Sequence, residues 1–150
     1  MRTLRLVSAA LTATLLSASL GGAVPAGAAD SGRIKIAVIT DMSGVYASLS
    51  GQGAVEATKM AVEDFGGKVL GRSIVVDAVD HRNQGPEAAT KAREEFDSGA
   101  ELALDMTNSG AALAVAGVAK EKHKIAIVTG GGTSDLTGPA CNKYTYHYAY

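Results

Sequence analysis

Short apolar runs rich in β-branched residues alternate along the chain with segments in which apolar residues recur every three or four positions. The first run, 34–39, is interrupted only by Lys35, which is typical of a strand covered on both faces. Parallel sheets place strands in that environment. The same pattern predicts further strands at 74–79, 102–106 and 125–128, with 144–148 as a candidate fifth strand.

Three helices are predicted between these strands. The first covers 54–65, and Gly66-Gly67 follows it as a stop signal. The second begins at Pro86, because proline suits the first helical position, and it ends near Phe96. The third, 111–119, consists mostly of small residues. One side of the first helix carries its apolar residues, Ala54, Val55, Ala57, Met60, Ala61 and Phe65.

This alternation predicts an α/β fold, a doubly wound, Rossmann-like parallel sheet with right-handed crossovers. In the strand order 2-1-3-4, the first and third strands are neighbours whose connections leave toward opposite faces of the sheet. Ligands bind at such a switch point, beside the carboxyl ends of the strands. We therefore expect three loops, 41–53, 107–110 and 130–134, to meet at one crevice.

Composition limits the classes of function. The chain has 150 residues, of which 47% are hydrophobic and 19% charged, and its formal net charge is −1. This length suits one hydrophobic core, and the balanced charge argues against nucleic acid as a partner.

The first 28 residues have the pattern of a secretory signal peptide. Two arginines precede an apolar stretch over 6–20, and Ala26-Gly27-Ala28 forms a small-residue cleavage site. A membrane anchor is the alternative, but the apolar stretch is short, contains Ser and Thr, and is followed by Gly and Pro. We expect cleavage after Ala28, leaving 29–150 as the mature chain.

Cys141 is the single cysteine of the chain. In an exported protein such a thiol is either buried, where it packs as a small hydrophobe, or paired with a cysteine from outside this sequence. We favour burial.

The three predicted loops are rich in hydrogen-bonding groups and glycine. Asn108-Ser109-Gly110 directly precede a helix, and they can cap it while leaving backbone N–H groups for an anion. The glycines at 130–132 let backbone amides approach a ligand, and Thr133 and Ser134 add hydroxyls. Caps and turns explain each loop equally well alone, but three such loops at neighbouring strand ends favour a ligand site. The first loop contributes Ser43, Gly44, Tyr46, Ser48, Ser50 and Gln52.

The sequence supports other chemistries weakly. Gly51-Gln52-Gly53 begins like a dinucleotide fingerprint, but Glu56 replaces the third glycine and the preceding loop is too long. The three histidines are far apart, which argues against a metal site built from them. Asp77 and Asp80 fit solvated strand-end carboxylates better than an acid–base pair. We expect no cofactor and no metal.

Four segments together resemble one family of proteins. They are IKIAVITDMSG from Ile34, GQGAVEATKMAVEDFGGKVLG from Gly51, NQGPEAATKAREEF from Asn83, and KIAIVTGGGTSDLT from Lys124. In this order and spacing they are similar to the amino-terminal part of type I periplasmic solute-binding proteins of ABC importers, in the branch that includes the leucine/isoleucine/valine-binding proteins. The resemblance covers essentially the whole mature chain.

The resemblance implies a ligand held between two lobes, with its carboxylate and amino groups bound by strand-end hydroxyls and backbone amides. By position, Ser109 matches the family's serine after the third strand. Gly130 and Gly132 fall where the family offers a backbone carbonyl and a threonine. The hydroxyl missing at Gly132 would come from Thr133 or Ser134.

The resemblance also implies the remaining expectations. Tyr46 falls where the family often places a side chain against the ligand, and residues 29–150 would form an incomplete amino-terminal lobe. The implied function is capture of a small solute, such as a branched-chain amino acid or another small carboxylate, including an aromatic one. We expect a periplasmic monomer without catalytic activity that delivers this solute to an ABC permease in the inner membrane.

Two alternatives stay open. The same fold serves as the ligand-sensing domain of a receptor, which would require a membrane helix or a signalling domain downstream. An exported α/β hydrolase is the third interpretation, but the sequence contains no GxSxG nucleophile elbow.

Overall fold

A computed structural model describes residues 32–148 of the chain. The predicted signal peptide, residues 1–28, lies outside the described residues. Within residues 32–148, no helix is long and apolar enough to cross a membrane.

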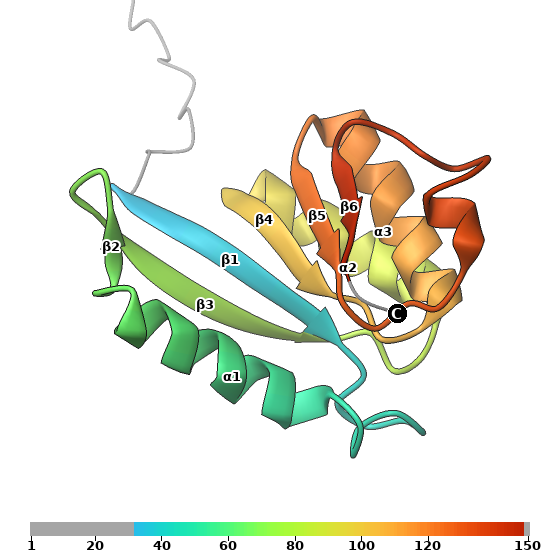
Figure 1. Ribbon diagram of the computed structural model, residues 1–150, viewed down its shortest axis with the longest axis horizontal. Coiled ribbons are helices and arrows are strands. Elements are labelled where there is room, and N and C mark those ends of the chain that lie inside the picture. The colour runs from blue at the N-terminus through green and yellow to red at the C-terminus, as the bar shows by residue number, and fades with distance from the viewer. Residues whose placement is uncertain (1–31, 149–150) are drawn as a thin grey trace, which may run out of the picture.

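The described chain forms one curled sheet of six strands with helices on both faces (Figure 1). The strands are ordered β2-β3-β1-β4-β5-β6, and all neighbouring pairs are parallel except β2 with β3. The elements in chain order are β1 (Arg33–Thr40), α1 (Gly51–Asp64), β2 (Lys68–Val69), β3 (Arg72–Asp80), α2 (Gly85–Asp97), β4 (Ala100–Asp105), α3 (Ser109–Lys122), β5 (Ile125–Val128), the short 3-10 helix η1 (Ser134–Leu136) and β6 (Thr145–His147).

The predicted α/β architecture is confirmed. The four strands expected in the order 2-1-3-4 are β3, β1, β4 and β5, in that spatial order, and the candidate fifth strand is β6 at the edge. The sheet is mixed rather than wholly parallel, because the two residues of β2 turn back antiparallel to the start of β3. A strand of two residues is too short to show an alternating hydrophobic pattern.

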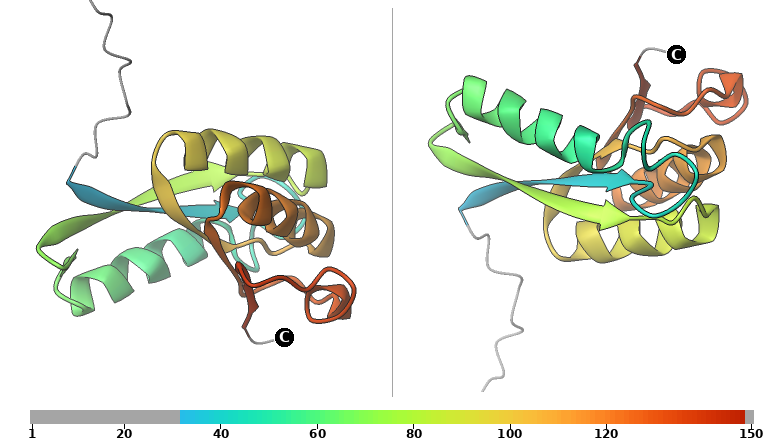
Figure 2. Two further views of the ribbon diagram at one scale, coloured as in Figure 1. Left: turned by 90° about the horizontal axis from the view of Figure 1, so that it is seen from above. Right: turned by 90° about the horizontal axis from the view of Figure 1, so that it is seen from below.

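Helices α2 and α3 cover one face of the sheet, and α1 lies on the other face (Figure 2). The interface with α2 and α3 is built from alanines, which let helix and sheet backbones approach closely at native packing density. Phe96 and Met106 fill the larger spaces of this core. Its buried alanines are Ala37, Ala100, Ala103 and Ala126 on the strands, and Ala88, Ala92, Ala111, Ala112, Ala116 and Ala119 on the helices.

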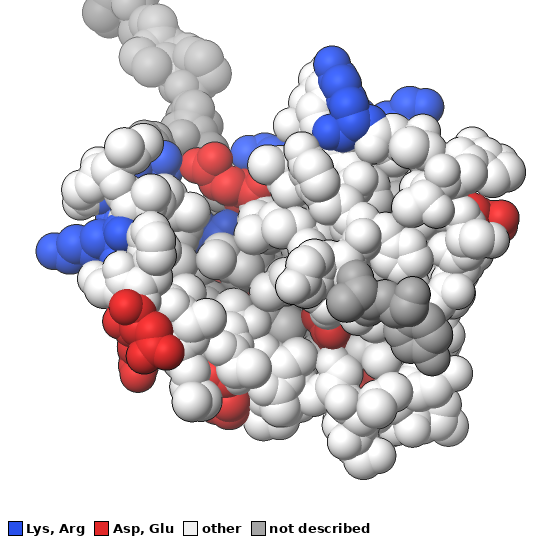
Figure 3. Space-filling model, in the orientation of Figure 1, with Lys and Arg blue, Asp and Glu red and all other residues white. Residues whose placement is uncertain are grey.

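The other face of the sheet is only partly covered. Helix α1 has its apolar side where the sequence predicts it, but Met60 and Phe65 of that side are 64% and 68% exposed. Phe65 borders a hollow of about 540 Å³ that Met60 does not line, and the opposite wall of this hollow is the apolar face of β4 and β5, including Leu104 and Ile127. On the face seen in Figure 3, the charged side chains lie mainly toward the edges. The described residues therefore leave apolar surface open between α1 and the sheet.

Cys141 is exposed, so the expectation that it is buried is wrong. It lies in the connection between η1 and β6, after a run of turns, where no core element covers it. A lone cysteine in a sequence does not reveal on which side of a loop its thiol lies.

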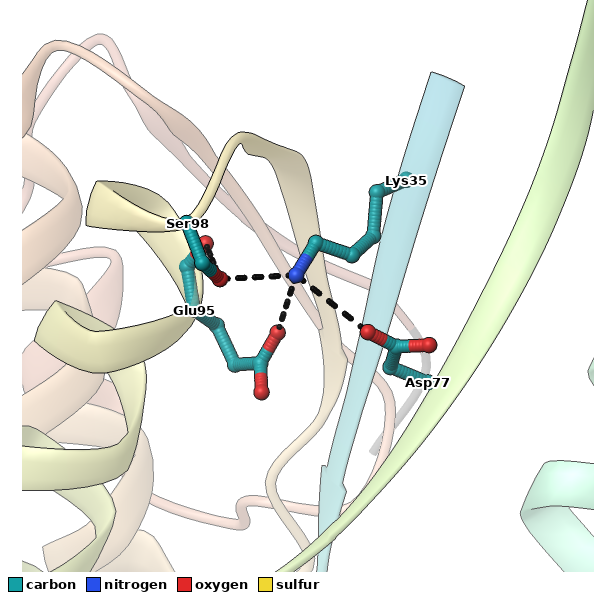
Figure 4. Close-up of polar contacts among 4 residues, drawn as sticks. All are labelled: Lys35, Asp77, Glu95 and Ser98. Atoms are coloured by element: carbon teal, nitrogen blue, oxygen red, sulfur yellow. Dashed lines mark hydrogen bonds and ion pairs between the residues drawn. The ribbon is translucent and has the colours of Figure 1, made fainter. Parts of the chain in front are cut away.

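An ion-pair cluster joins β1, β3 and α2 at the end of β1 opposite its carboxyl-terminal loop (Figure 4). The Lys35 ammonium lies 3.0 Å from a Glu95 carboxylate oxygen and 3.2 Å from one of Asp77, and it donates to the Ser98 hydroxyl at 2.7 Å. Burial lowers the pKa of Lys35, but its bonds to Glu95 and Asp77 outweigh burial and leave the pKa raised. Lys35, the charged interruption in the first strand, is thus a cross-link between layers.

We predict that Lys35→Met lowers the free energy of unfolding by about 1 to 2 kcal/mol, between the values of exposed and buried ion pairs. The physical reason is that Glu95, whose side chain is only 19% exposed, loses its cation. Urea unfolding of the full-length protein, followed by circular dichroism, measures the change.

The matched control for this prediction is Lys59→Met, which removes the exposed pair between Lys59 and Glu56 on α1. Its cost should stay below about 0.5 kcal/mol. Equal costs for the two variants would contradict a structural role for the Lys35 cluster.

Candidate functional site

The carboxyl ends of β1, β4 and β5 lie side by side in the sheet. From β1 the chain continues to α1 on one face, and from β4 it continues to α3 on the other face (Figure 2). The neighbours β1 and β4 thus form the predicted switch point, and the loops after β1, β4 and β5 meet there.

Asp105, the last residue of β4, is the centre of this meeting point. It is 5% exposed, and its carboxylate accepts hydrogen bonds from three hydroxyls. Ser50 donates at 2.5 Å and Thr107 at 2.8 Å to one carboxylate oxygen, and Thr129 donates at 2.9 Å to the other. The three donors come from the three loops, so one carboxylate ties the loops together.

Two further features support this arrangement. Ser50 stands at the N-cap of α1 but makes no capping bond, because its hydroxyl donates to Asp105 instead. The backbone reverses at Asp105 and Met106, whose φ angles of 88° and 52° lie in the left-handed region that non-glycine residues rarely adopt. Such local strain is concentrated at functional sites and requires the surrounding structure to hold it.

A cavity of about 550 Å³ opens above the Asp105 network, within the usual size range of small-molecule sites. Its floor includes Asp105, Thr107 and Thr129. The first loop and the first turn of α1 form a side wall. The lining residues are Ala47, Ser48, Leu49, Ser50, Gln52, Gly53, Ala54, Ala57, Asp105, Thr107, Thr129 and Gly130.

Two glycines after β5 are required by close packing against the β4–α3 loop and the first turn of α3. A Cβ on Gly130 would lie 2.9 Å from the Thr107 Cα, and one on Gly131 would lie 2.8 Å from the Ala112 Cβ. Side chains at these positions would push the loops apart and displace Thr129. The glycine run therefore shapes the floor of the cavity through backbone approach.

Two aspartates hold the first loop in place. The buried Asp41 accepts from the backbone N–H groups of Gly44 at 2.7 Å and Tyr46 at 2.9 Å. Asp80, at the end of β3, accepts from the Ser43 hydroxyl at 2.7 Å and from the N–H groups of Met42 and Arg82. Burial raises the pKa of Asp80, but these hydrogen bonds outweigh it and keep the pKa below its usual value.

His81 is fully buried directly after β3. Its Nδ1 accepts from the Asn83 N–H at 3.0 Å, so the neutral ring carries its proton on Nε2, which has no hydrogen-bond partner within the described residues. Burial lowers the pKa of His81, although the carboxylates of Asp41, Asp80 and Asp105 act in the opposite direction.

The residues predicted in the first two loops mostly bind other parts of the protein. Ser43 is engaged with Asp80, and the Tyr46 side chain is 38% exposed and does not line the cavity. Asn108 caps α3 by accepting from the Ala111 N–H at 2.9 Å, so the capping residue is Asn108 and not Ser109. Ser109 is the half-buried first residue of that helix. Contacts of these residues with a ligand stay a prediction.

In the third loop, Gly130 lines the cavity, whereas Gly132 is exposed. Thr133 caps η1 by accepting from the Asp135 N–H at 3.2 Å, and Ser134 is exposed at the start of η1. Neither hydroxyl lines the cavity. Whether one of them reaches a ligand stays a prediction.

Three residues of the Asp105 network lie outside the predicted loops, and the other two, Ser50 and Thr107, were predicted only as parts of their loops. Thr40 is fully buried, with its hydroxyl 3.0 Å from that of Ser50. The available signal was position: each overlooked residue is at, or within two residues of, the carboxyl end of a predicted strand. The overlooked residues are Thr40, Asp105 and Thr129.

Comparison with known proteins identifies the family to which the chain belongs. The family model of periplasmic binding proteins matches residues 33–150, which is most of the chain. The chain belongs to the periplasmic binding protein family. This confirms the resemblance seen in the sequence. No curated protein matches the chain.

Solved structures of periplasmic binding proteins share the fold. A periplasmic binding protein from Burkholderia mallei is 52% identical, with a TM-score of 0.77 over 79% of this chain and 32% of that one. A branched-chain amino acid ABC transporter periplasmic ligand-binding protein from Burkholderia xenovorans is 39% identical, with a TM-score of 0.72 over 75% of this chain and 30% of that one.

A third structure is a solute-binding protein of an ABC transporter from Rhodopseudomonas palustris, in complex with benzoate. It is 27% identical, with a TM-score of 0.68 over 75% of this chain and 31% of that one. The chain thus spans about a third of the length of the periplasmic binding proteins it matches.

We predict that the stability of this periplasmic binding protein falls below pH 6.5 because of His81. The unfolded chain takes up a proton on His81 near pH 6.5, whereas the folded protein does so only at lower pH. Between the two pKa values the unfolded state binds more protons than the folded state. The contribution of neutral, buried His81 to the free energy of unfolding is therefore fully present above pH 6.5. This contribution is lost as the pH decreases, so the free energy of unfolding falls by up to about 1.4 kcal/mol per pH unit.

The measurement is urea unfolding of the wild type and of His81→Gln between pH 7.5 and 5.5. The stability difference between the two proteins should shrink toward acid pH, while His123→Gln, at an exposed histidine, should keep the wild-type profile. Parallel profiles for wild type and His81→Gln would refute this role of His81.

Proposed function

We propose that the protein captures a small solute outside the cytoplasm and delivers it to an ABC permease in the inner membrane. The observation that carries this proposal is the cavity of about 550 Å³ over the Asp105 network, where three loops meet at the switch point of the sheet. Membership of the periplasmic binding protein family supports binding, rather than catalysis, as the activity of this site.

We further propose that the solute is a branched-chain amino acid or another small carboxylate, including an aromatic one. The Burkholderia xenovorans relative is described as a branched-chain amino acid transporter protein, and the Rhodopseudomonas palustris relative is complexed with benzoate. Both kinds of solute fit a cavity of this size.

We infer that residues 29–150 belong to the amino-terminal lobe of a two-lobe protein, and that a second lobe closes over the cavity. The matched structures are about three times longer than the matched part, which supports this arrangement. Hinge closure would bury the ligand from both sides and exclude water. A solute bound to one wall alone competes with water for each hydrogen bond, which leaves little net affinity.

The proposed function predicts that the full-length protein is stabilised by its solute. The panel to be screened consists of branched-chain amino acids, aromatic amino acids and benzoates. A ligand that binds the folded protein, present at 100 times its dissociation constant, should raise the free energy of unfolding by about 2.7 kcal/mol. Thermal unfolding finds the ligand, and calorimetry gives its affinity.

Two controls sharpen this experiment. A dinucleotide such as NAD should not shift the melting temperature, and residues 29–150 alone should bind the solute much more weakly than the full-length protein. If no amino acid, amine or small acid stabilises the full-length protein, the proposed function is wrong. Equal affinity of residues 29–150 and the full-length protein would instead contradict the two-lobe arrangement.

We also propose that residues 1–28 are a cleaved signal peptide, in line with the extracytoplasmic location that the family implies. The expected mature amino terminus is Ala29 or Asp30. Mass spectrometry of the exported protein measures it. An exported form that retains Met1 would disprove cleavage.

A further inference from the structure

The loop between β3 and α2 is joined to the start of α3 by a bond between two asparagines that lie 25 residues apart in the chain. The Asn83 side-chain oxygen accepts from the side-chain amide nitrogen of Asn108 at 2.5 Å. A Cβ on Gly85 would lie 3.1 Å from the Gly110 carbonyl oxygen, so the backbones of the two segments are also in close contact. This close approach brings the two asparagine side chains within hydrogen-bond distance.

Asn108 is held at both ends of its side-chain amide. Its oxygen accepts from the Ala111 N–H at 2.9 Å and caps α3, and its nitrogen donates to Asn83. A flipped amide would turn a donor toward the Ala111 N–H and an acceptor toward the Asn83 oxygen, so only one orientation satisfies both bonds. Thr107 of the cavity floor directly precedes Asn108, and Ser109, a predicted ligand contact, directly follows it. The bond to Asn83 therefore fixes the residue that joins the cavity floor to α3.

Asn83 is in turn held by His81. Arg82 and Asn83 have φ angles of 51° and 57°, in the left-handed region, and such a backbone requires support from its surroundings. The Asn83 N–H donates to Nδ1 of the buried His81 at 3.0 Å, and the His81 N–H donates to the Thr40 carbonyl oxygen at 2.9 Å. A series of hydrogen bonds thus runs from the end of β1 through His81 and Asn83 to Asn108.

The bond from Asn83 to His81 requires a neutral imidazole ring. In the neutral ring Nδ1 is an acceptor, whereas the protonated ring carries a hydrogen on both nitrogens and would set its Nδ1–H against the Asn83 N–H. Burial lowers the pKa of His81, and the carboxylates around the ring, Asp41 after β1, Asp80 in β3 and Asp105 in β4, act in the opposite direction. Burial prevails, so the ring is neutral at pH 7 and takes up its proton only below pH 6.5.

We infer that Asn83 is a positioning residue of the solute site, which orients Asn108 and the start of α3 and makes the affinity for the solute depend on a neutral His81. Asn83 does not line the cavity, so it acts through Asn108 and not by touching the solute. Protonation of His81 removes the support of Asn83, and the capping amide then loses its fixed orientation. This inference rests on the proposed function and adds control by pH to the same site.

The first test is Asn83→Gly in the full-length protein. Glycine adopts the left-handed backbone without strain, so the variant removes the acceptor for Asn108 and leaves the loop unstrained. The probe is whichever of the branched-chain amino acids, the aromatic amino acids and benzoate binds the wild type most tightly. Its affinity at pH 7.5, measured by calorimetry, should fall by about threefold to tenfold, which corresponds to one neutral hydrogen bond.

The matched control is Arg82→Gly, at the neighbouring left-handed position. It changes the backbone in the same way as Asn83→Gly, but it removes an exposed side chain that does not line the cavity. The affinity of this variant for the probe should stay at the wild-type value.

A pH series separates positioning from a general effect on the loop. Between pH 7.5 and 5.5 the wild type should lose affinity as His81 takes up its proton, and Arg82→Gly should follow the same profile. Asn83→Gly has already lost the link to Asn108, so the difference between its affinity and that of the wild type should shrink toward acid pH. Circular dichroism at each pH verifies that the three proteins are folded.

Each outcome decides the inference. Weaker binding by Asn83→Gly but not by Arg82→Gly, with a difference from the wild type that shrinks toward pH 5.5, supports it. Unchanged affinity of Asn83→Gly, equal losses in both variants, or a difference that is constant with pH overturns it and leaves solute capture intact. If Asn83→Gly fails to fold, the wild type decides, and an affinity that is independent of pH overturns the inference. If no amino acid, amine or small acid binds the full-length protein, the proposed function is refuted, and this inference with it.

Discussion

The parallel pairing of β1 with both β3 and β4 is the constraint on which the rest of the structure depends. In its carboxyl-terminal half, β1 is buried on both faces, and its register with its two neighbours fixes where the three strands end. Because the chain leaves β1 and β4 toward opposite faces of the sheet, the loops after these two strands separate at their carboxyl ends and leave room for a ligand. The site follows from strand order and needs no additional domain to define its position.

The two ends of the β1–β4 pair carry different kinds of polar cluster. At one end, Lys35 is neutralised by Glu95 and Asp77, and the cluster joins sheet and helix without reference to any ligand. At the other end, the Asp105 carboxyl group accepts hydrogen bonds from three hydroxyls and takes part in none of the ion pairs of the described residues. The first cluster joins the sheet to a helix, whereas the second joins the three loops of the site to one another.

The two hollows beside the sheet also differ in chemistry. The apolar hollow lies between α1 and the faces of β4 and β5, and the cavity over the Asp105 network, whose lining mixes polar and apolar groups, lies at the carboxyl ends of these strands. Asp105 and Thr129 border both, so the polar network forms the boundary between them.

The sequence by itself determined the alternation of strands and helices and the three loops after the strands, because these follow from local periodicity and chain connectivity. The strand order 2-1-3-4 entered as an assumption, which the structure confirms. Only the tertiary structure decided which side chains in those loops meet. Asp105 joins Ser50, 55 residues earlier, and Thr129, 24 residues later, through a backbone reversal with positive φ that no local pattern announces. The exposure of Cys141 and of the apolar side of α1 was likewise beyond the sequence. Burial depends on what packs from elsewhere in the chain, and periodicity records only which side of an element is apolar.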